Sequence, residues 1–190
     1  MKIEELRPEQ LDEARRVIAE LFPWEDEHQT ALAAALQPEE HGVFLVDRRL
    51  ERVRFWVARF DDRLVGVAGL YDYRGMPTES WLSWFGLLPV MRGHGQGARF
   101  LDWIIQLTRQ EGRAVLRLWT TDEEEYAAAT RLYLKRGFTV EDHPVLPGED
   151  WRTLVMSLGL NGTTPIPWLS LHDRPELCGR MIPATAVKVA

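Results

Sequence analysis

Residues 79–110, ESWLSWFGLLPVMRGHGQGARFLDWIIQLTRQ, decide the fold. Glu79 to Leu88 is rich in strand-forming residues and predicts a strand that runs straight into Pro89. Glycines then alternate at positions 93, 95 and 97. From Ala98 to Gln110 the apolar residues recur at helical spacing, and Gly112 is placed to cap that helix. The inner side of the helix is predicted to be Ala98, Leu101, Ile104, Ile105 and Thr108.

The glycine loop has the features of a diphosphate site. Without Cβ atoms in the way, the amides of Gly93, Gly95 and Gly97 can point into one concavity. The unpaired N–H groups and the positive dipole end of the following helix face the same place, and Arg92 adds charge there. A nucleoside-triphosphate loop is excluded because no Lys-Ser/Thr pair follows, and Phe100 stands where a dinucleotide fingerprint needs glycine. The alternative is a tight turn that uses glycine only for packing.

The flanking segments predict an α/β fold with a mixed, mostly antiparallel sheet flanked by helices. A first helix opens at Pro8 and ends before Pro23, and a second runs from Asp26 to Gln37. The helix of residues 123–136 carries acidic residues at its start and a glycine at its end. The expected strands, besides residues 79–88, are Lys2 to Leu6, the hairpin of Val53 to Phe60 and Leu64 to Tyr71, Val115 to Trp119, Phe138 to Val140, and Arg152 to Leu158.

The chain divides into residues 1–158, which carry this pattern, and a C-terminal extension of residues 159–190. The extension holds Pro165, Pro167, Pro175 and Pro183 and has no sustained hydrophobic period. It is expected to be either flexible or packed on the domain.

Composition narrows the function classes. The 190 residues, with 45% hydrophobic and 27% charged residues, suit one domain with one core. The net charge is −6 and no basic stripe is visible, which argues against a nucleic-acid partner. A negative net charge favours attraction of a cationic amine substrate, and it also serves simply to keep a protein soluble.

The single cysteine, Cys178, excludes an intrachain disulfide. No apolar run reaches the ~18 residues of a membrane span, and no signal peptide is visible, so a cytoplasmic protein is expected. His28 and His94 lack partners at metal-ligand spacing, so no metal is expected.

Two motifs, taken in order, resemble the N-acetyltransferases of the GNAT superfamily. Arg92, Gly95 and Gly97 match the family loop Arg/Gln-x-x-Gly-x-Gly/Ala. Residues 129–138, ATRLYLKRGF, match the family pattern Ala-x-x-Leu-Tyr-x-x-x-Gly-Phe. The order of elements also agrees over about residues 1–158.

The resemblance implies acetyl-CoA as the acyl donor and direct transfer of acetyl to an amine. The pantetheine arm would lie between two splayed strands and pair with the backbone of Phe85 and Leu87. Tyr126 stands where many family members carry an asparagine that contacts the cofactor. The residues around the pyrophosphate would be Arg92, Gly93, His94, Gly95, Gln96, Gly97 and Ala98.

Tyr133 is the candidate general acid, because the resemblance places this tyrosine beside the sulfur of coenzyme A. Its alternative role is a core aromatic residue before a helix cap. A backbone N–H near Leu87 would be the oxyanion donor. No general base is evident: where some relatives have a glutamate, this chain has Ser83 and Trp84.

The predicted acceptor is a small cationic amine: an aminoglycoside-like compound, a polyamine or an amino acid derivative. Candidate acceptor-binding residues are Glu25 and Asp26 at the start of the second helix, and Tyr71, Glu79 and Trp84 on strands beside the expected cleft. Sheet packing is the commoner role of such aromatic residues, and the acidic residues at the helix start also serve to cap a helix. A peptide or protein amine, and a non-catalytic acyl-CoA-binding module, remain the alternatives. The oligomeric state stays open, with a homodimer as one alternative.

Overall fold

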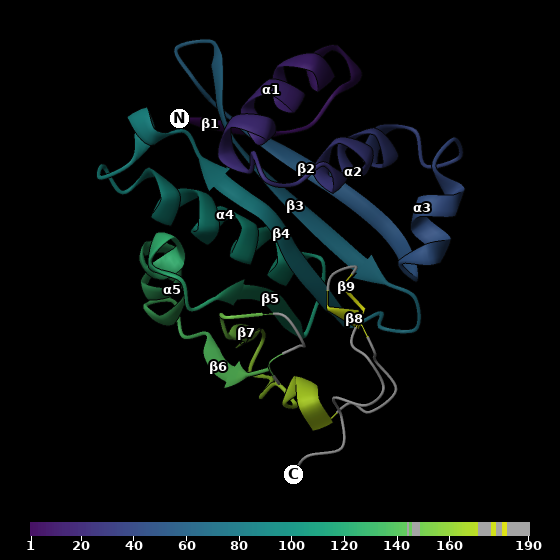
Figure 1. The fold of residues 1–190 in the computed structure, drawn as a ribbon, viewed down its shortest axis with the longest axis vertical. Helices are drawn as coiled ribbons and strands as arrows, with labels where there is room; N and C mark the ends of the chain where they lie inside the picture. Colours follow the sequence, from purple (N-terminus) through teal and green to yellow (C-terminus); the bar gives the residue numbers. More distant parts are fainter. Residues whose placement is uncertain (144, 146–148, 171–175, 178–179, 182–190) are drawn as a thin grey trace.

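The computed structural model describes residues 1–143, 145, 149–170, 176–177 and 180–181. It shows a central sheet with helices on both faces (Figure 1). The helices are α1 (Leu11–Leu21), α2 (Glu27–Leu36), α3 (Gly42–Asp47), α4 (Gln96–Gln110) and α5 (Ala127–Leu134), with short 3₁₀ turns η1 (Pro8–Gln10), η2 (Pro89–Met91), η3 (Glu124–Tyr126) and η4 (Trp168–Ser170). The strands are β1 (Lys2–Glu5), β2 (Leu50–Phe60), β3 (Arg63–Tyr73), β4 (Glu79–Leu87), β5 (Val115–Thr121), β6 (Thr139–Asp142), β7 (Thr153–Gly159), β8 (Glu176–Leu177) and β9 (Arg180–Met181).

Seven strands form the main sheet in the order β1-β2-β3-β4-β5-β7-β6. Every neighbouring pair is antiparallel except β4 and β5, which are parallel. The connection between the two parallel strands is the glycine loop and α4, the crossover that parallel strands require. The predicted mixed, mostly antiparallel α/β fold is therefore confirmed.

Two hydrophobic clusters cover the two faces of the sheet. Strand β2 contributes to both, because successive side chains point to opposite faces: Phe55 and Val57 join one cluster, and Trp56 and Ala58 join the other. The first cluster includes Ile18 of α1 and residues of α2 and α3, whereas the second includes residues of α4 and α5. The helices that precede the hairpin thus cover one face, and those that follow the glycine loop cover the other.

The helix boundaries differ from the sequence prediction at several places. The first helix was expected to open at Pro8, but residues 8–10 form the 3₁₀ turn η1 and α1 begins at Leu11. Helix α4 begins two residues earlier than expected, at Gln96, because Gly95 adopts a left-handed conformation (φ 72°) and acts as its N-cap. The predicted helix over residues 123–136 is shorter and begins with the 3₁₀ turn η3. Helix α3 was not predicted, because six residues are too few to show a helical period.

The first part of the extension packs on the sheet. Trp168 is buried, and its ring centroid lies 4.7 Å from that of Trp81. The backbone carbonyl of Ile166 accepts a hydrogen bond from Arg117 at 2.8 Å. The carboxylate of Glu141 accepts the amide protons of Trp168 and Leu169. Residues 166–169 therefore contact the sheet, and Cys178 lies outside the described residues.

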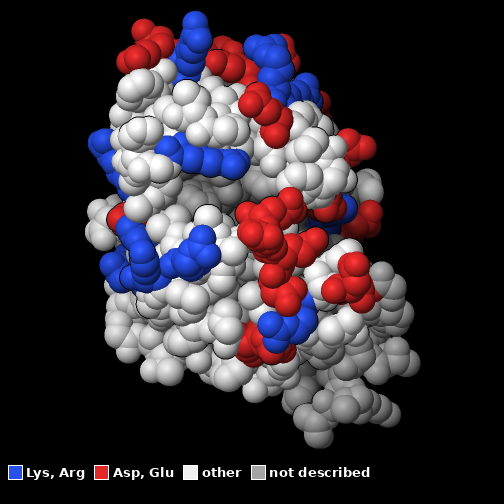
Figure 2. Space-filling view, turned by 60° about the vertical axis from the view of Figure 1, so that its left-hand side comes forward, with Lys and Arg blue, Asp and Glu red and all other residues white. Residues whose placement is uncertain are grey.

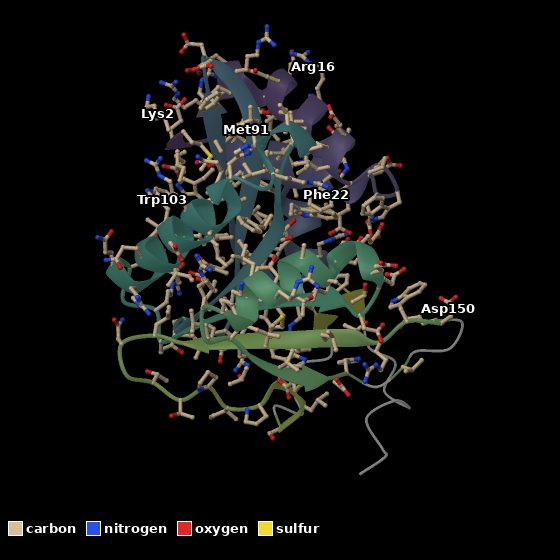
Figure 3. All side chains as sticks on the ribbon, turned by 90° about the vertical axis from the view of Figure 1, so that its left-hand side faces the viewer. Lys2, Arg16, Phe22, Met91, Trp103 and Asp150 are labelled. Atoms are coloured by element: carbon tan, nitrogen blue, oxygen red, sulfur yellow. The ribbon has the colours of Figure 1, made fainter. Side chains whose placement is uncertain are left out.

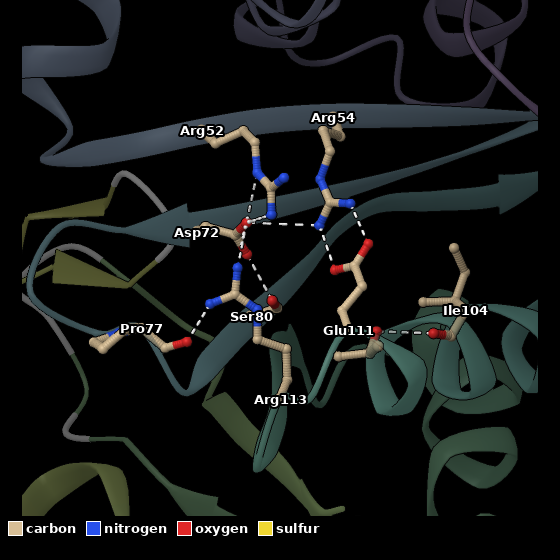
Figure 4. Close-up of polar contacts among 9 residues, drawn as sticks. Arg52, Arg54, Asp72, Pro77, Ser80, Ile104, Glu111 and Arg113 are labelled. Carbon is tan, nitrogen blue, oxygen red and sulfur yellow. Dashed lines mark hydrogen bonds and ion pairs between the residues drawn. The ribbon is translucent and has the colours of Figure 1, made fainter.

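An ionic cluster fastens four segments at one end of the sheet (Figure 4). Its centre is Asp72 of β3, whose side chain is only 3% exposed. The carboxylate accepts hydrogen bonds from Arg52 at 2.7 Å, from Arg113 at 2.9 Å and from the Ser80 hydroxyl at 2.6 Å. Arg54 lies 3.6 Å away and also pairs with a glutamate that follows α4. The cluster therefore ties β2, β3 and β4 to the segment that leads into β5.

A second ion pair is buried in the same region. The guanidinium of Arg117 in β5 is fully buried and donates to Glu79 of β4 at 2.9 Å. It also donates to the hydroxyl of Ser157 in β7 at 2.6 Å. A charge in this position is tolerated only because its hydrogen-bonding capacity is filled by these partners.

Replacing Glu79 with alanine should therefore destabilise the protein strongly. Removing one partner of a buried pair leaves an uncompensated charge, which costs about 3–5 kcal/mol. The matched control is Asp102→Ala, because Asp102 forms an exposed pair with Arg136 and its loss should cost about 1 kcal/mol or less. Urea unfolding of both variants measures the difference. Similar losses in the two variants would contradict this view of Arg117.

Candidate active site

The two parallel strands separate after a short stretch of pairing. β4 and β5 are paired only where Glu79, Ser80 and Trp81 face Val115, Leu116 and Arg117. Beyond that point β4 stays paired with β3, and β5 stays paired with β7. The sheet therefore opens into a wedge whose closed end carries the two ion clusters.

A bulge in β4 shapes one wall of this wedge. Trp84 has a φ of 49°, which is unusual for a bulky residue, and the pairing with β3 shifts between Val67 and Gly69. The indole N–H of Trp84 donates to the hydroxyl of Tyr71 at 2.9 Å, which fixes the ring. Such strain persists where the surroundings over-determine it, and it gathers at functional sites.

The end of β4 turns an unpaired edge toward the gap. The amide of Leu88 donates to the carbonyl of Val65 in β3. Because successive peptide groups of a strand point to opposite sides, those of Leu87 point away from β3, toward the gap. The guanidinium of Arg92 donates to the Leu87 carbonyl at 3.4 Å. The Leu87 amide is thus presented to whatever lies between the strands.

The glycine loop follows directly. Gly93 and Gly95 have φ values of 78° and 72°, and nothing lies within 4 Å of a Cβ built on either. Residues 92–95 are exposed, and within the described structure no amide from Gly93 to Ala98 donates a hydrogen bond. The ring of His94 bonds to the Arg92 carbonyl at 2.8 Å and not to any of those amides. A run of free amides at the start of a fifteen-residue helix has the geometry that suits an anion.

A cavity of about 620 Å³ lies in the wedge beyond the paired residues. Its wall is formed by the α1–α2 connection, the bulge of β4, the end of β5, the start of α5 and the β6–β7 connection. The lining residues are Phe22, Trp24, Glu25, Glu27, Leu82, Ser83, Trp84, Phe85, Leu118, Trp119, Thr120, Thr121, Glu123, Glu125, Tyr126, Ala129, Tyr133 and Trp151.

One face of α5 contributes the tyrosine that was predicted as the acid. Tyr126, Ala129 and Tyr133, three and four residues apart, all line the cavity. The ring of Tyr133 packs 6.3 Å from Phe85 of β4, and in the described structure its hydroxyl makes no hydrogen bond. Burial raises the pKa of Tyr133, so its hydroxyl stays protonated through the neutral range.

The cavity is acidic at its outer end. Four glutamates line it, and no lysine or arginine does. Glu27 is neutralised by a two-point pair with Arg48, both contacts being 2.7 Å. Figure 2 shows the hollowed face, with acidic side chains gathered on one side of the hollow and basic side chains on the other. The cleft therefore separates the two kinds of charge.

Comparison with known proteins agrees with this geometry. The sequence model of the acetyltransferase (GNAT) family matches residues 8–138. The chain belongs to the GNAT family of acetyltransferases. No curated protein sequence matches it.

Solved GNAT structures share the fold. An aminoglycoside 6'-N-acetyltransferase complexed with coenzyme A superposes with a TM-score of 0.65 at 18% identity, covering 88% of this chain and 99% of that one. The ribosomal-protein-S18-alanine N-acetyltransferase from Escherichia coli gives 0.61 at 19% identity, covering 88% and 98%. A chimera of the spermidine N-acetyltransferase from Vibrio cholerae gives 0.62 at 16% identity, covering 84% and 96%. The GNAT fold and the neighbour with coenzyme A together support the use of acetyl-CoA.

The structure brings together some of the predicted site residues of this GNAT protein. Glu25, Trp84, Phe85, Tyr126 and Tyr133 all line the cavity. Leu87 and the loop of residues 92–98 lie beyond it, at the end of β4.

Three predicted acceptor residues fall outside the lining. Asp26 is exposed at the N-cap of α2. Tyr71 is buried and reaches the site only through its bond to Trp84. Glu79 is committed to Arg117 at the closed end of the wedge, so it is not placed to contact an acceptor.

Several lining residues of the GNAT site were missed from the sequence. Phe22 and Trp24 flank Pro23 in the α1–α2 connection, whereas Trp119 lies in β5 and Trp151 in the connection that leads into β7. Figure 3 shows Phe22 and Asp150, the neighbour of Trp151, on the same side of the molecule. No local pattern marks these residues, because they meet only when the two halves of the sheet diverge.

In the described part of the chain, no group of three or more metal-ligand side chains occurs, and no helix is long and apolar enough to cross a membrane.

Gly95→Glu should abolish the binding of acetyl-CoA. The new carboxylate would occupy the free amides and repel the pyrophosphate. The matched control is Gly75→Glu, because Gly75 also has a left-handed conformation (φ 77°) in open space but lies in the β3–β4 turn. Isothermal titration with acetyl-CoA should show normal affinity for the control only. Equal affinity in both variants would remove the loop from the cofactor site.

Proposed function

We propose that this protein transfers the acetyl group of acetyl-CoA directly to the primary amine of a small cationic acceptor. The observation that carries the proposal is the position of Tyr133. Tyr133 lines the cavity together with four glutamates, and the glycine loop follows at the end of β4, which forms one wall of the same cavity.

The donor half of the site is built from backbone groups. The amides of Gly93 to Ala98 hold the pyrophosphate, and Arg92 adds positive charge beside them. The open edge of β4 at Phe85 and Leu87 pairs with the amides of the pantetheine arm. Tyr126 takes the place of the asparagine that many relatives use, so one polar contact with the arm is lost while the rest of the donor site is kept.

The chemical step needs an oxyanion donor and a proton donor. As the N–C bond forms, charge builds on the carbonyl oxygen, where the Leu87 amide donates a hydrogen bond. As the C–S bond breaks, the Tyr133 hydroxyl donates to the sulfur, and its raised pKa ensures that the proton is present. The proton that the amine gives up leaves toward the carboxylate-lined end of the cavity.

The acidic mouth favours a small cationic acceptor over a peptide. Negative charge attracts and holds ammonium groups, and a cavity of about 620 Å³ has the size of a small-molecule site. The structural neighbours include enzymes named for aminoglycosides and for spermidine, and one named for a protein substrate.

A thiol-release assay with a panel of amines tests the proposal. Acetyl-CoA is mixed with protein and with a polyamine, an aminoglycoside, an amino acid amide or a short peptide. Release of free thiol with the cationic small amines supports the proposal, and preference for the peptide supports a protein acceptor. If acetyl-CoA at a hundred times its Kd stabilises the protein by about 2.7 kcal/mol but no amine is consumed, the protein is a binding module.

Tyr133→Phe should lower kcat roughly 10²-fold, since it removes the proton donor, while the Kd for acetyl-CoA stays the same. The control is Tyr73→Phe, because Tyr73 is buried against Trp81 and lies outside the cavity. Steady-state rates and isothermal titration separate the two effects. An unchanged kcat in Tyr133→Phe would exclude this tyrosine from the reaction.

A further inference from the structure

Trp24 and Tyr126 touch across the mouth of the cavity. Trp24 lies in the α1–α2 connection, and Tyr126 lies directly before α5 on the other side of the wedge. Their ring centroids are 6.4 Å apart, with the planes at 80°. Trp24 is 56% exposed, so this contact does not serve the hydrophobic core.

Other rings continue the same arrangement inward. Phe22 stands at 83° to Trp24 and at 73° to Trp84, with centroid distances of 6.1 and 5.3 Å. Each aromatic ring has a negative face that attracts an ammonium group, and several rings gathered at one place can surround it. All four rings line the cavity.

Negative charge surrounds the outer pair. Glu123 and Glu125 line the same mouth, and neither forms an ion pair within the described part of the chain. Burial raises the pKa of Tyr126, and a hydrogen bond to Glu125 together with the charges of Glu123 and Glu25 raises it further. The ring of Tyr126 therefore sits in a field that favours a cation beside it.

This field has a consequence for the kind of acceptor. An amine must lose its proton before it attacks, so a monoamine is neutral when it reacts. The carboxylates would then stabilise the unreactive ammonium form more than the transition state, which opposes catalysis. A diamine keeps the charge of its second ammonium group throughout the reaction. The carboxylates then stabilise its ground state and its transition state to the same extent.

The distance between the two ends of the site suits such a molecule. Tyr126 and Tyr133 are seven residues apart, which corresponds to about 10 Å along a helix. The reacting amine lies near Tyr133 and the aromatic pair near Tyr126. An acceptor with two amines separated by several carbons spans this distance.

We propose that Trp24 and Tyr126 form an aromatic clasp that holds a second, non-reacting ammonium group, so that the preferred acceptor is a diamine or polyamine. This inference rests on the proposed transfer of acetyl to an amine. Trp24 and Tyr126 are, in this view, the residues that determine acceptor specificity.

The test compares diaminopentane with pentylamine, which have the same chain length and differ by one charge. For the unaltered protein, kcat/KM from thiol release should be much higher for the diamine. In Trp24→Leu this ratio should fall about tenfold, the size expected of a lost cation–π contact. The control is Trp103→Leu: Trp103 packs against Trp56, and Figure 3 shows it on the opposite side of the molecule from Phe22. The control should keep the ratio.

A second comparison tests the charges. The double variant Glu123→Gln/Glu125→Gln should lower the preference for the diamine and weaken its dependence on salt. Its control is Glu39→Gln/Glu40→Gln, which changes the net charge equally at an exposed turn between α2 and α3. Only the first variant should alter the ratio.

Measurements of equilibrium binding test the clasp separately from the proposed acetyl transfer. Isothermal titration of diaminopentane into the protein with coenzyme A needs no turnover. Binding that Trp24→Leu weakens, without acetylation of any amine, would leave the clasp in place and overturn the proposed function. Turnover of amines without a preference for the diamine, or an equal loss for both amines in Trp24→Leu, would overturn the clasp and leave the function in place.

Discussion

The site depends on the point at which β4 and β5 stop pairing, after Trp81 and Arg117. Each strand is held on its other edge, β4 by β3 and β5 by β7, so neither can follow the other. Ion clusters around Asp72 and Arg117 fasten the two strands where they still pair. The wedge is therefore rigid at one end and open at the other, and the open end supplies both a free peptide edge and a cavity.

The features that were predictable from the sequence are those set by local chemistry. The glycine loop and α4 were predictable because left-handed glycines and a 3.6-residue period are properties of one short segment. The shared face of Tyr126 and Tyr133 follows from helical spacing, even though η3 and α5 divide that segment. The family motifs added the expectation of a splayed sheet, and the short pairing of β4 with β5 fits it.

The features that were not predictable depend on contacts between distant segments. Glu79 was a candidate for acceptor binding because its strand flanks the cleft. Its carboxylate instead forms an ion pair with Arg117, which lies 38 residues later in the chain. Trp24 reaches the cavity only because α1 and α2 pack on one face of the sheet while α5 packs on the other. Neither pairing leaves a periodic signal, so tertiary structure alone decides them.

The packing of residues 160–170 against the sheet has a consequence for how far the chain can be truncated. The family match ends at residue 138, yet the buried guanidinium of Arg117 finds two of its acceptors in Ser157 and Ile166. The inner strand β7 also lies past that limit. A fragment that ends at residue 138 would therefore leave the buried guanidinium of Arg117 without two of its hydrogen-bond acceptors. The structural unit of this protein therefore extends past the family match, through at least residue 166.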